Sequence, residues 1–114
     1  MATTDDATVL LQLLQWGAST GLDDAMRHVF SEDFDVKATP GSMNIDPSAR
    51  TVLAFFETAG ALVKHGTLDI ALLHDIYWIA GVWERVSGHA LNIRATANEP
   101  RMYEHFEAIA KYAG

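Results

Sequence analysis

Apolar residues recur at helical spacing along most of the chain, and this pattern predicts an all-helical protein. Within residues 4–16, Val9, Leu10, Leu13 and Leu14 keep the rhythm of an amphipathic helix, and a glycine at position 17 offers a stop. A second, short helix is predicted to start at Thr20 or Gly21. Its apolar residues share one face, and they are Leu22, Met26, Val29 and Phe30.

The helical pattern lapses over residues 35–45. The run Thr39-Pro40-Gly41-Ser42 has turn chemistry, because proline presets φ and glycine tolerates positive φ. A short strand over residues 34–37 stays open as an alternative. We expect this to be the longest segment without regular structure.

Asp46 and Pro47 predict the start of a third helix. An aspartate at the N-cap accepts backbone N–H groups of the first turn, and proline suits the first helical position. Gly66 is placed to follow the helix in the left-handed conformation. Because apolar residues cover more than one side, this helix should be surrounded by others. They are Val52, Phe55, Phe56, Ala59, Leu62 and Val63.

A fourth helix, from Asp69 (with Thr67 as the alternative cap) to about Val86, is predicted to be central. Its apolar residues lie on opposite sides, so it must be enclosed by the protein or by a partner. Gly81 allows a kink, and Ser87-Gly88 is predicted to bend or break the chain. One face carries Leu72, Ile76, Ile79, Trp83 and Val86, and the other carries Ile70, Leu73, Tyr77 and Ala80.

A fifth element over residues 89–96 and a last helix that starts at Pro100 complete the pattern. We therefore expect residues 1–114 to form one helical domain. Its predicted class is all-α, a single irregular bundle of five or six helices, with the third and fourth helices at its centre.

Composition excludes several classes of protein. Apolar residues make up 49% of the chain and charged residues 20%, a globular balance. The chain has no cysteine, so disulfides and thiolate metal sites are excluded. No apolar run is long enough for a membrane span, and two acids stand where a secretory signal would be basic. We expect a cytoplasmic protein.

The net charge of −7 is uneven, because residues 1–46 hold eight acids against two bases. No cluster of lysine and arginine exists to neutralise phosphates, so we expect neither a nucleic-acid partner nor a membrane partner. The acidic half serves solubility or faces a basic partner.

A motif over residues 56–69 carries a resemblance to a known family. It reads Phe-Glu-x-x-Gly-x-Leu-Val-Lys-x-Gly-x-Leu-Asp and is followed by Tyr77, Trp83-Glu84, Arg94, Tyr103 and Phe106-Glu107. In this order the chain resembles, over about residues 50–112, a bacterial family of small all-helical domains known as a domain of unknown function. The resemblance implies a helical bundle and no assigned chemistry.

His74-Asp75 is the one dipeptide that matches a motif known from a class of enzymes. In metal-dependent phosphohydrolases of the His-Asp type, such a pair on a helix supplies two metal ligands, and an upstream histidine and a downstream aspartate complete the site. His28 or His65 could serve as the upstream histidine, but the acidic residues after Asp75 are all glutamates, with no aspartate among them. The plainer interpretation is that both side chains lie on the polar edge of a buried helix.

The sequence contains no motif for other kinds of catalytic site or for a metal site. No two of the five histidines are three or four residues apart, the spacing that puts two ligands on one helical face. There is no Gly-x-Ser-x-Gly elbow and no glycine-rich phosphate loop. We expect no catalytic residue, no cofactor and no bound metal.

Arg94 is predicted to form a structural ion pair between helices. An arginine that reaches into a bundle needs a carboxylate, because an unpaired buried charge is costly. The candidate partners are Glu57 and Glu84.

Trp78 is the candidate anchor of a protein interface. It falls on the same side of the predicted fourth helix as Asp75, Val82 and Arg85, so it is less enclosed than the other aromatic residues. The alternative is a core tryptophan whose N–H finds a backbone carbonyl. The interface candidates are therefore Trp78, Val82 and Arg85.

These observations favour a non-enzymatic protein-interaction or self-associating module, as a homodimer or with another protein. The first alternative is a small-molecule or metal binder with an aromatic-walled pocket. The second alternative is a metal-dependent hydrolase that uses His74 and Asp75. The pocket of the first alternative would be walled by Phe55, Tyr77, Trp83 and Phe106.

Overall fold

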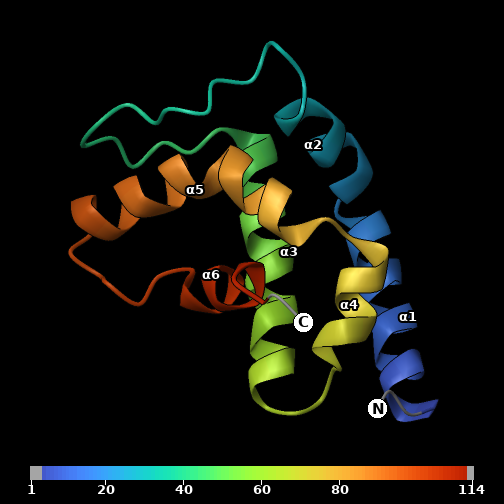
Figure 1. Ribbon diagram of the computed structural model, residues 1–114. Helices are drawn as coiled ribbons and strands as arrows, with labels where there is room; N and C mark the ends of the chain where they lie inside the picture. The colour runs from blue at the N-terminus through green and yellow to red at the C-terminus, as the bar shows by residue number, and fades with distance from the viewer. Residues whose placement is uncertain (1–3, 113–114) are drawn as a thin grey trace.

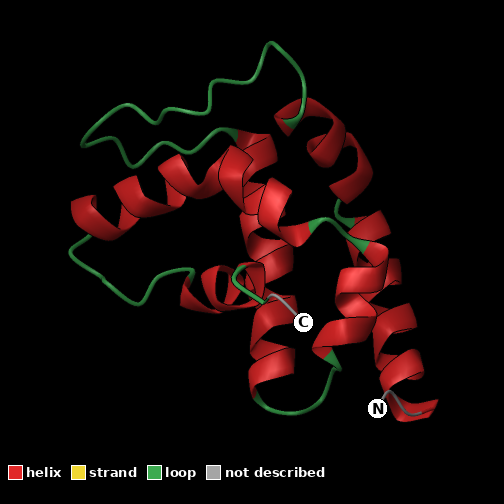
Figure 2. Ribbon diagram, viewed as in Figure 1, coloured by secondary structure: helices red, strands yellow, loops and turns green. Residues whose placement is uncertain are grey.

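The protein is an all-α bundle, as its apolar pattern predicts. The structure, a computed structural model, describes residues 4–112, and in that range it has six helices and no strand (Figures 1 and 2). The alternative strand over residues 34–37 is wrong. None of the helices in this range has the length and apolarity to cross a membrane. The helices are α1 (Thr4–Ser19), α2 (Leu22–Val29), α3 (Pro47–Lys64), α4 (Ile70–Ile76), α5 (Ile79–Thr96) and α6 (Glu104–Ala110).

Helix α3 lies at the centre of the bundle, and α2, α5 and α6 pack against it (Figure 1). The side chain of Asp46 caps it, accepting the N–H groups of Ser48 and Ala49 at 2.8 and 3.1 Å. Gly66 follows its end with φ of 76°, as predicted. The apolar residues of α3 are enclosed on several sides, and those with no exposed surface include Val52, Leu53, Phe55, Phe56 and Ala59.

The fourth predicted helix is two helices, so its predicted continuity from Asp69 to Val86 is wrong. Tyr77 and Trp78 leave the helical conformation, with ψ of 140° and 76°. A straight rod would present its two apolar faces in opposite directions. The break lets Leu73 from α4 and Ile79 from α5 enter the same core. Ile76, predicted to be buried, is 50% exposed beside the break.

Ser87-Gly88 does not break the chain, because α5 runs through it to Thr96. The residue predicted to interrupt a helix serves instead as a point of close approach. A Cβ at Gly88 would lie 2.6 Å from the carbonyl oxygen of Val36, in the long loop between α2 and α3. Glycine at this position lets that loop lie directly against α5.

Helix α6 begins at Glu104, later than the predicted start at Pro100, which lies in the preceding turn. Its N-cap residue, Tyr103, has φ of 60° and no side-chain cap bond. Glu57 on α3 replaces that cap, because its Oε1 accepts the N–H of Phe106 at 2.9 Å. The start of α6 is therefore stabilised by a residue far away in the sequence.

Arg94 forms an ion pair, but with a different carboxylate from the two predicted. Its Nη1 lies 3.1 Å from Oε1 of Glu107 on α6, and its Nε donates to the carbonyl of Met102. Glu57 is occupied as the cap of α6. Glu84 is exposed on α5, ten residues before Arg94, which places it about 15 Å away along the same helix. The docking of α6 on α5 decides the pairing.

The role of Glu57 can be tested by replacing it with glutamine and with alanine. Glutamine keeps an acceptor oxygen for the N–H of Phe106, whereas alanine leaves that donor unpaired. We expect Glu57→Ala to cost about 1–2 kcal/mol in the free energy of unfolding and Glu57→Gln less than half of that. Urea unfolding measures both. Equal losses for the two variants would mean that the charge of Glu57, not its cap bond, is what matters.

Candidate functional site

Two exposed aromatic side chains lie against each other where α2 ends and α5 begins. The ring centroids of Phe30 and Trp78 are 6.3 Å apart with planes 19° from parallel. Trp78 is 71% exposed and Phe30 is 43% exposed. We call these two residues the aromatic pair. Two exposed aromatic rings that lie together are a candidate binding surface, because a partner that covers them removes apolar surface from water.

The break between α4 and α5 places Trp78 on the surface. As the N-cap of α5, Trp78 lies just outside the helix, and its indole folds over the first turn onto Gly81. A Cβ at Gly81 would lie 2.4–2.5 Å from three atoms of the indole ring, so only glycine allows this contact. The indole is thus held in position and exposed at the same time.

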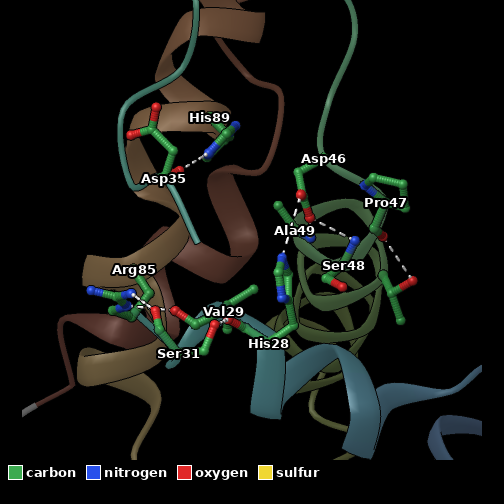
Figure 3. A network of polar contacts seen from close by, with 11 residues as sticks. His28, Val29, Ser31, Asp35, Asp46, Pro47, Ser48, Ala49, Arg85 and His89 are labelled. Atoms are coloured by element: carbon green, nitrogen blue, oxygen red, sulfur yellow. Dashed lines mark hydrogen bonds and ion pairs between the residues drawn. The ribbon is translucent and has the colours of Figure 1, made fainter. Parts of the chain in front are cut away.

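Arg85 of α5 holds the backbone on both sides of Phe30. Phe30 is the C-cap of α2, and the guanidinium of Arg85 donates hydrogen bonds to the carbonyls of its two neighbours, Val29 and Ser31 (Figure 3). The same guanidinium lies 5.7 Å from the centre of the Phe34 ring. One arginine therefore fixes the end of α2 against α5.

The three interface candidates fall in different environments. Trp78, which the sequence left as either an interface or a core residue, is exposed. Arg85 is half-buried and its donors contact backbone carbonyls, so its role here is to hold α2 in place. Val82 is buried in the hydrophobic core and does not reach the surface. The three residues therefore do not form one exposed surface.

The loop that follows Phe30 is tied down along α5. His89 donates from Nε2 to the carbonyl of Asp35 at 2.8 Å (Figure 3), and Asn92 donates to the carbonyl of Ser42 at 2.8 Å while accepting the N–H of Gly41 at 3.0 Å. These residues, with Arg85 and Gly88, follow one stripe of the helix. The segment predicted to be irregular is irregular, but it is anchored at several points.

His74 and Asp75 do not meet further metal ligands. His74 donates from Nε2 to the carbonyl of Ile109 at 2.8 Å, and its ring centre is 4.9 Å from that of Tyr112. Asp75 is exposed. Across residues 4–112, no three histidine and carboxylate side chains gather as a metal site would require. His74 joins α4 to α6, and the His-Asp arrangement of a hydrolase is not assembled there.

The rings proposed as pocket walls pack against one another instead. Phe56 is in edge or stacked contact with Phe55, Tyr77 and Phe106 at centroid distances of 5.0–5.2 Å. Trp83 lies 4.9 Å from Phe106. Burial, and secondarily the charge of Asp23, raises the pKa of the Tyr77 hydroxyl. These aromatic residues fill the core between α3, α5 and α6.

A shallow depression of about 320 Å³ lies elsewhere, near the turn between α3 and α4. Within its lining, Asp69 caps α4 by accepting the N–H of Leu72 at 3.0 Å. The depression therefore follows from the shape of a helix connection. It is lined by Asp6, Val63, Gly66, Leu68, Asp69 and Ile70.

Phe30 is the site residue that sequence reasoning missed. Its spacing from Leu22, Met26 and Val29 predicts a buried position on the second helix. In the structure α2 ends at Val29, and Phe30 turns outward. The polar run from Ser31 to Asp33 directly behind it was the available signal that the helix ends there.

Comparison with known proteins gives a family and nothing more specific. Neither the curated proteins nor the solved structures include a significant match to the chain. One family model matches residues 3–112, well beyond the part on which the resemblance was recognised. With that coverage, the chain belongs to the family described as a domain of unknown function (DUF4760).

Proposed function

We propose that this chain is a non-enzymatic protein-interaction module that docks through the aromatic pair. The observation that carries the proposal is Trp78, an indole that is 71% exposed and yet packed against Gly81 and Phe30. An exposed tryptophan that already packs on its neighbours loses less conformational entropy when a partner covers it than a free side chain would, so it is suited to be the centre of an interface. The partner is either a second copy of the chain or a different protein.

The test compares Trp78→Ala with Leu11→Ala, its matched control on α1, where Leu11 is 62% exposed. Both variants should remain folded, with unfolding free energies within about 1 kcal/mol of the wild type, because neither residue belongs to the core. Trp78→Ala should weaken partner binding at least about tenfold, and Leu11→Ala should not.

The measurement has two arms. Sedimentation of the wild type at several concentrations, repeated for both variants, reports self-association. Proteins retained by the immobilised wild type, but not by Trp78→Ala, are then purified and their binding is reconstituted from the two components alone. If a reconstituted partner, or a homodimer, binds Trp78→Ala as tightly as the wild type, the aromatic pair is not the docking surface.

A further inference from the structure

The surroundings of the aromatic pair are acidic. The segment around Phe30, residues 23–37, holds five acids against two bases, and the segment around Trp78, residues 74–85, holds two acids against one base. Glu32 and Asp33 follow Phe30 by two and three residues, and Asp75 precedes Trp78 by three residues; all three are exposed. Each residue of the aromatic pair therefore has exposed carboxylates within three residues of it in the chain.

Of the three bases in these segments, Lys37 is exposed seven residues after Phe30, and Arg27 and Arg85 have bonding partners of their own. Arg27 forms an ion pair with Asp24 at 2.8 Å on the surface of α2. Arg85 is half-buried and donates to the carbonyls of Val29 and Ser31. Neither removes the excess of carboxylates around the aromatic pair. The field at this surface favours a positively charged ligand.

A second copy of the chain is a poor occupant of this surface. Symmetric dimers place each surface patch against the same patch of the other copy. The acidic residues around one aromatic pair would then face those around the other, and like charges across an interface are unfavourable. An anionic membrane surface or a nucleic acid would meet the same repulsion.

The geometry points to a partner protein whose docking segment combines basic side chains with an apolar anchor, and this inference rests on the proposed function. The apolar anchor packs on Phe30 and Trp78. Its lysine or arginine side chains pair with Glu32, Asp33 and Asp75, and a guanidinium can also pack against the exposed part of the indole. Contact with the rings supplies affinity, and the carboxylates select the partner.

Selection from a library of short random peptides displayed on phage tests this without knowledge of the natural partner. The full chain is immobilised, and peptides that also bind an unrelated protein are removed. The enriched peptides are expected to carry net positive charge and at least one large apolar residue. Calorimetry with the purified peptides should show at least about tenfold weaker binding to Trp78→Ala and unchanged binding to Leu11→Ala.

Two further variants separate charge from ring contact. Glu32→Gln combined with Asp33→Asn should weaken the enriched peptides severalfold and flatten the fall in affinity with rising salt. The matched control, Asp5→Asn combined with Glu99→Gln, changes the net charge equally at positions outside the segments around the aromatic pair and should have no effect. Gly81→Ala displaces the indole and should weaken binding without removing any aromatic residue.

The outcomes distinguish the two proposals. Enriched peptides that depend on Trp78 but are neutral or acidic overturn the basic partner and leave the aromatic pair as the docking surface. Enriched peptides that bind Trp78→Ala equally well, or no enrichment at all, overturn both. A homodimer that Trp78→Ala dissociates would mean that the occupant is a second copy, which also overturns the basic partner.

Discussion

Replacing Gly60 with alanine is expected to destabilise the fold by about 2–4 kcal/mol. Gly60 lies on the buried face of α3 where α6 crosses it. A Cβ there would lie 2.4 Å from the carbonyl oxygen of His105 and 2.6 Å from its carbonyl carbon. Backbone atoms cannot rotate away as a side chain can, so α6 would have to move off α3.

Whether Gly60→Ala lowers or raises the free energy of unfolding is informative. In an unconstrained helix, alanine is more stable than glycine by about 1 kcal/mol, so helix propensity alone predicts a gain. A loss therefore reports the close approach of α6. Movement of α6 would also weaken the cap bond from Glu57 to Phe106 and the ion pair between Arg94 and Glu107.

Gly17→Ala on α1 is the matched control. A Cβ at Gly17 would meet side-chain atoms, the Phe55 ring at 2.8 Å and Leu22 at 3.1 Å, which can shift more readily than backbone. We expect a smaller loss than for Gly60→Ala, measured by urea unfolding of both variants under the same conditions. If Gly60→Ala is as stable as the wild type, or if Gly17→Ala costs more, the packing of α6 on α3 is looser than described.

Removing the carboxylate of Glu107 is expected to cost more than removing its partner Arg94. The side chain of Arg94 is only 15% exposed, and its Nη2 is buried without a hydrogen-bond partner. Glu107→Gln therefore leaves a half-enclosed charge without its counter-ion, at a cost of about 2 kcal/mol after allowance for the water that still reaches the pair. The lost pairing, not lost packing, causes the effect.

Arg94→Met should cost about 1 kcal/mol or less. Methionine fills the space of the arginine stem, and the carboxylate left behind is 28% exposed and has Lys111 at 3.8 Å. The double variant Arg94→Met with Glu107→Gln should be more stable than Glu107→Gln alone, because no charge is stranded. This reversal is a sharp test of the pairing.

Thermal unfolding of the three variants measures this order. Glu104→Gln is the control, because Glu104 pairs with Arg101 at 2.9 Å on the exposed surface and its loss should leave the unfolding midpoint unchanged. If Arg94→Met proves at least as costly as Glu107→Gln, the hydrogen bond from Arg94 to Met102 stabilises α6 more than the ion pair does.

The start of α3 shows what local sequence can predict. The aspartate and proline at positions 46 and 47 determine a cap through bonds to N–H groups two and three residues away, and the structure has those bonds. The left-handed Gly66 is likewise a local choice, because only the φ of one residue is involved. Both of these features depend on neighbours within one turn, and both were predicted correctly.

The helix break at Tyr77 and Trp78 shows where local sequence fails. No glycine or proline stands at these two positions, and the apolar spacing continues through them. Breaking the helix gives up backbone hydrogen bonds, and burial of both α4 and α5 in one core offsets that loss. This balance depends on packing against α3 and α6, and the apolar pattern within residues 70–86 carries no information about those helices.

The choice of a partner for Arg94 and the role of Gly88 were decided in the same way. Several carboxylates were available to Arg94, and the docking of α6 selected Glu107. A glycine beside a serine is consistent with a helix break or with the close approach of another segment. In the structure the carbonyl of Val36 lies directly against Gly88, so the glycine allows a close approach. Long-range packing made each choice.

By itself, the sequence determined that the protein is helical and where α3 begins, because these follow from spacing and from contacts within a turn. The tertiary structure alone decided that α4 and α5 are separate, that Phe30 and Trp78 meet on the surface, and that Glu57 caps α6. The second and third of these features join residues that are 48 and 49 positions apart in the chain. The first depends on whether burial in the core outweighs the loss of helix hydrogen bonds. Only the closed bundle brings such residues together, so no repeat along the chain can reveal them.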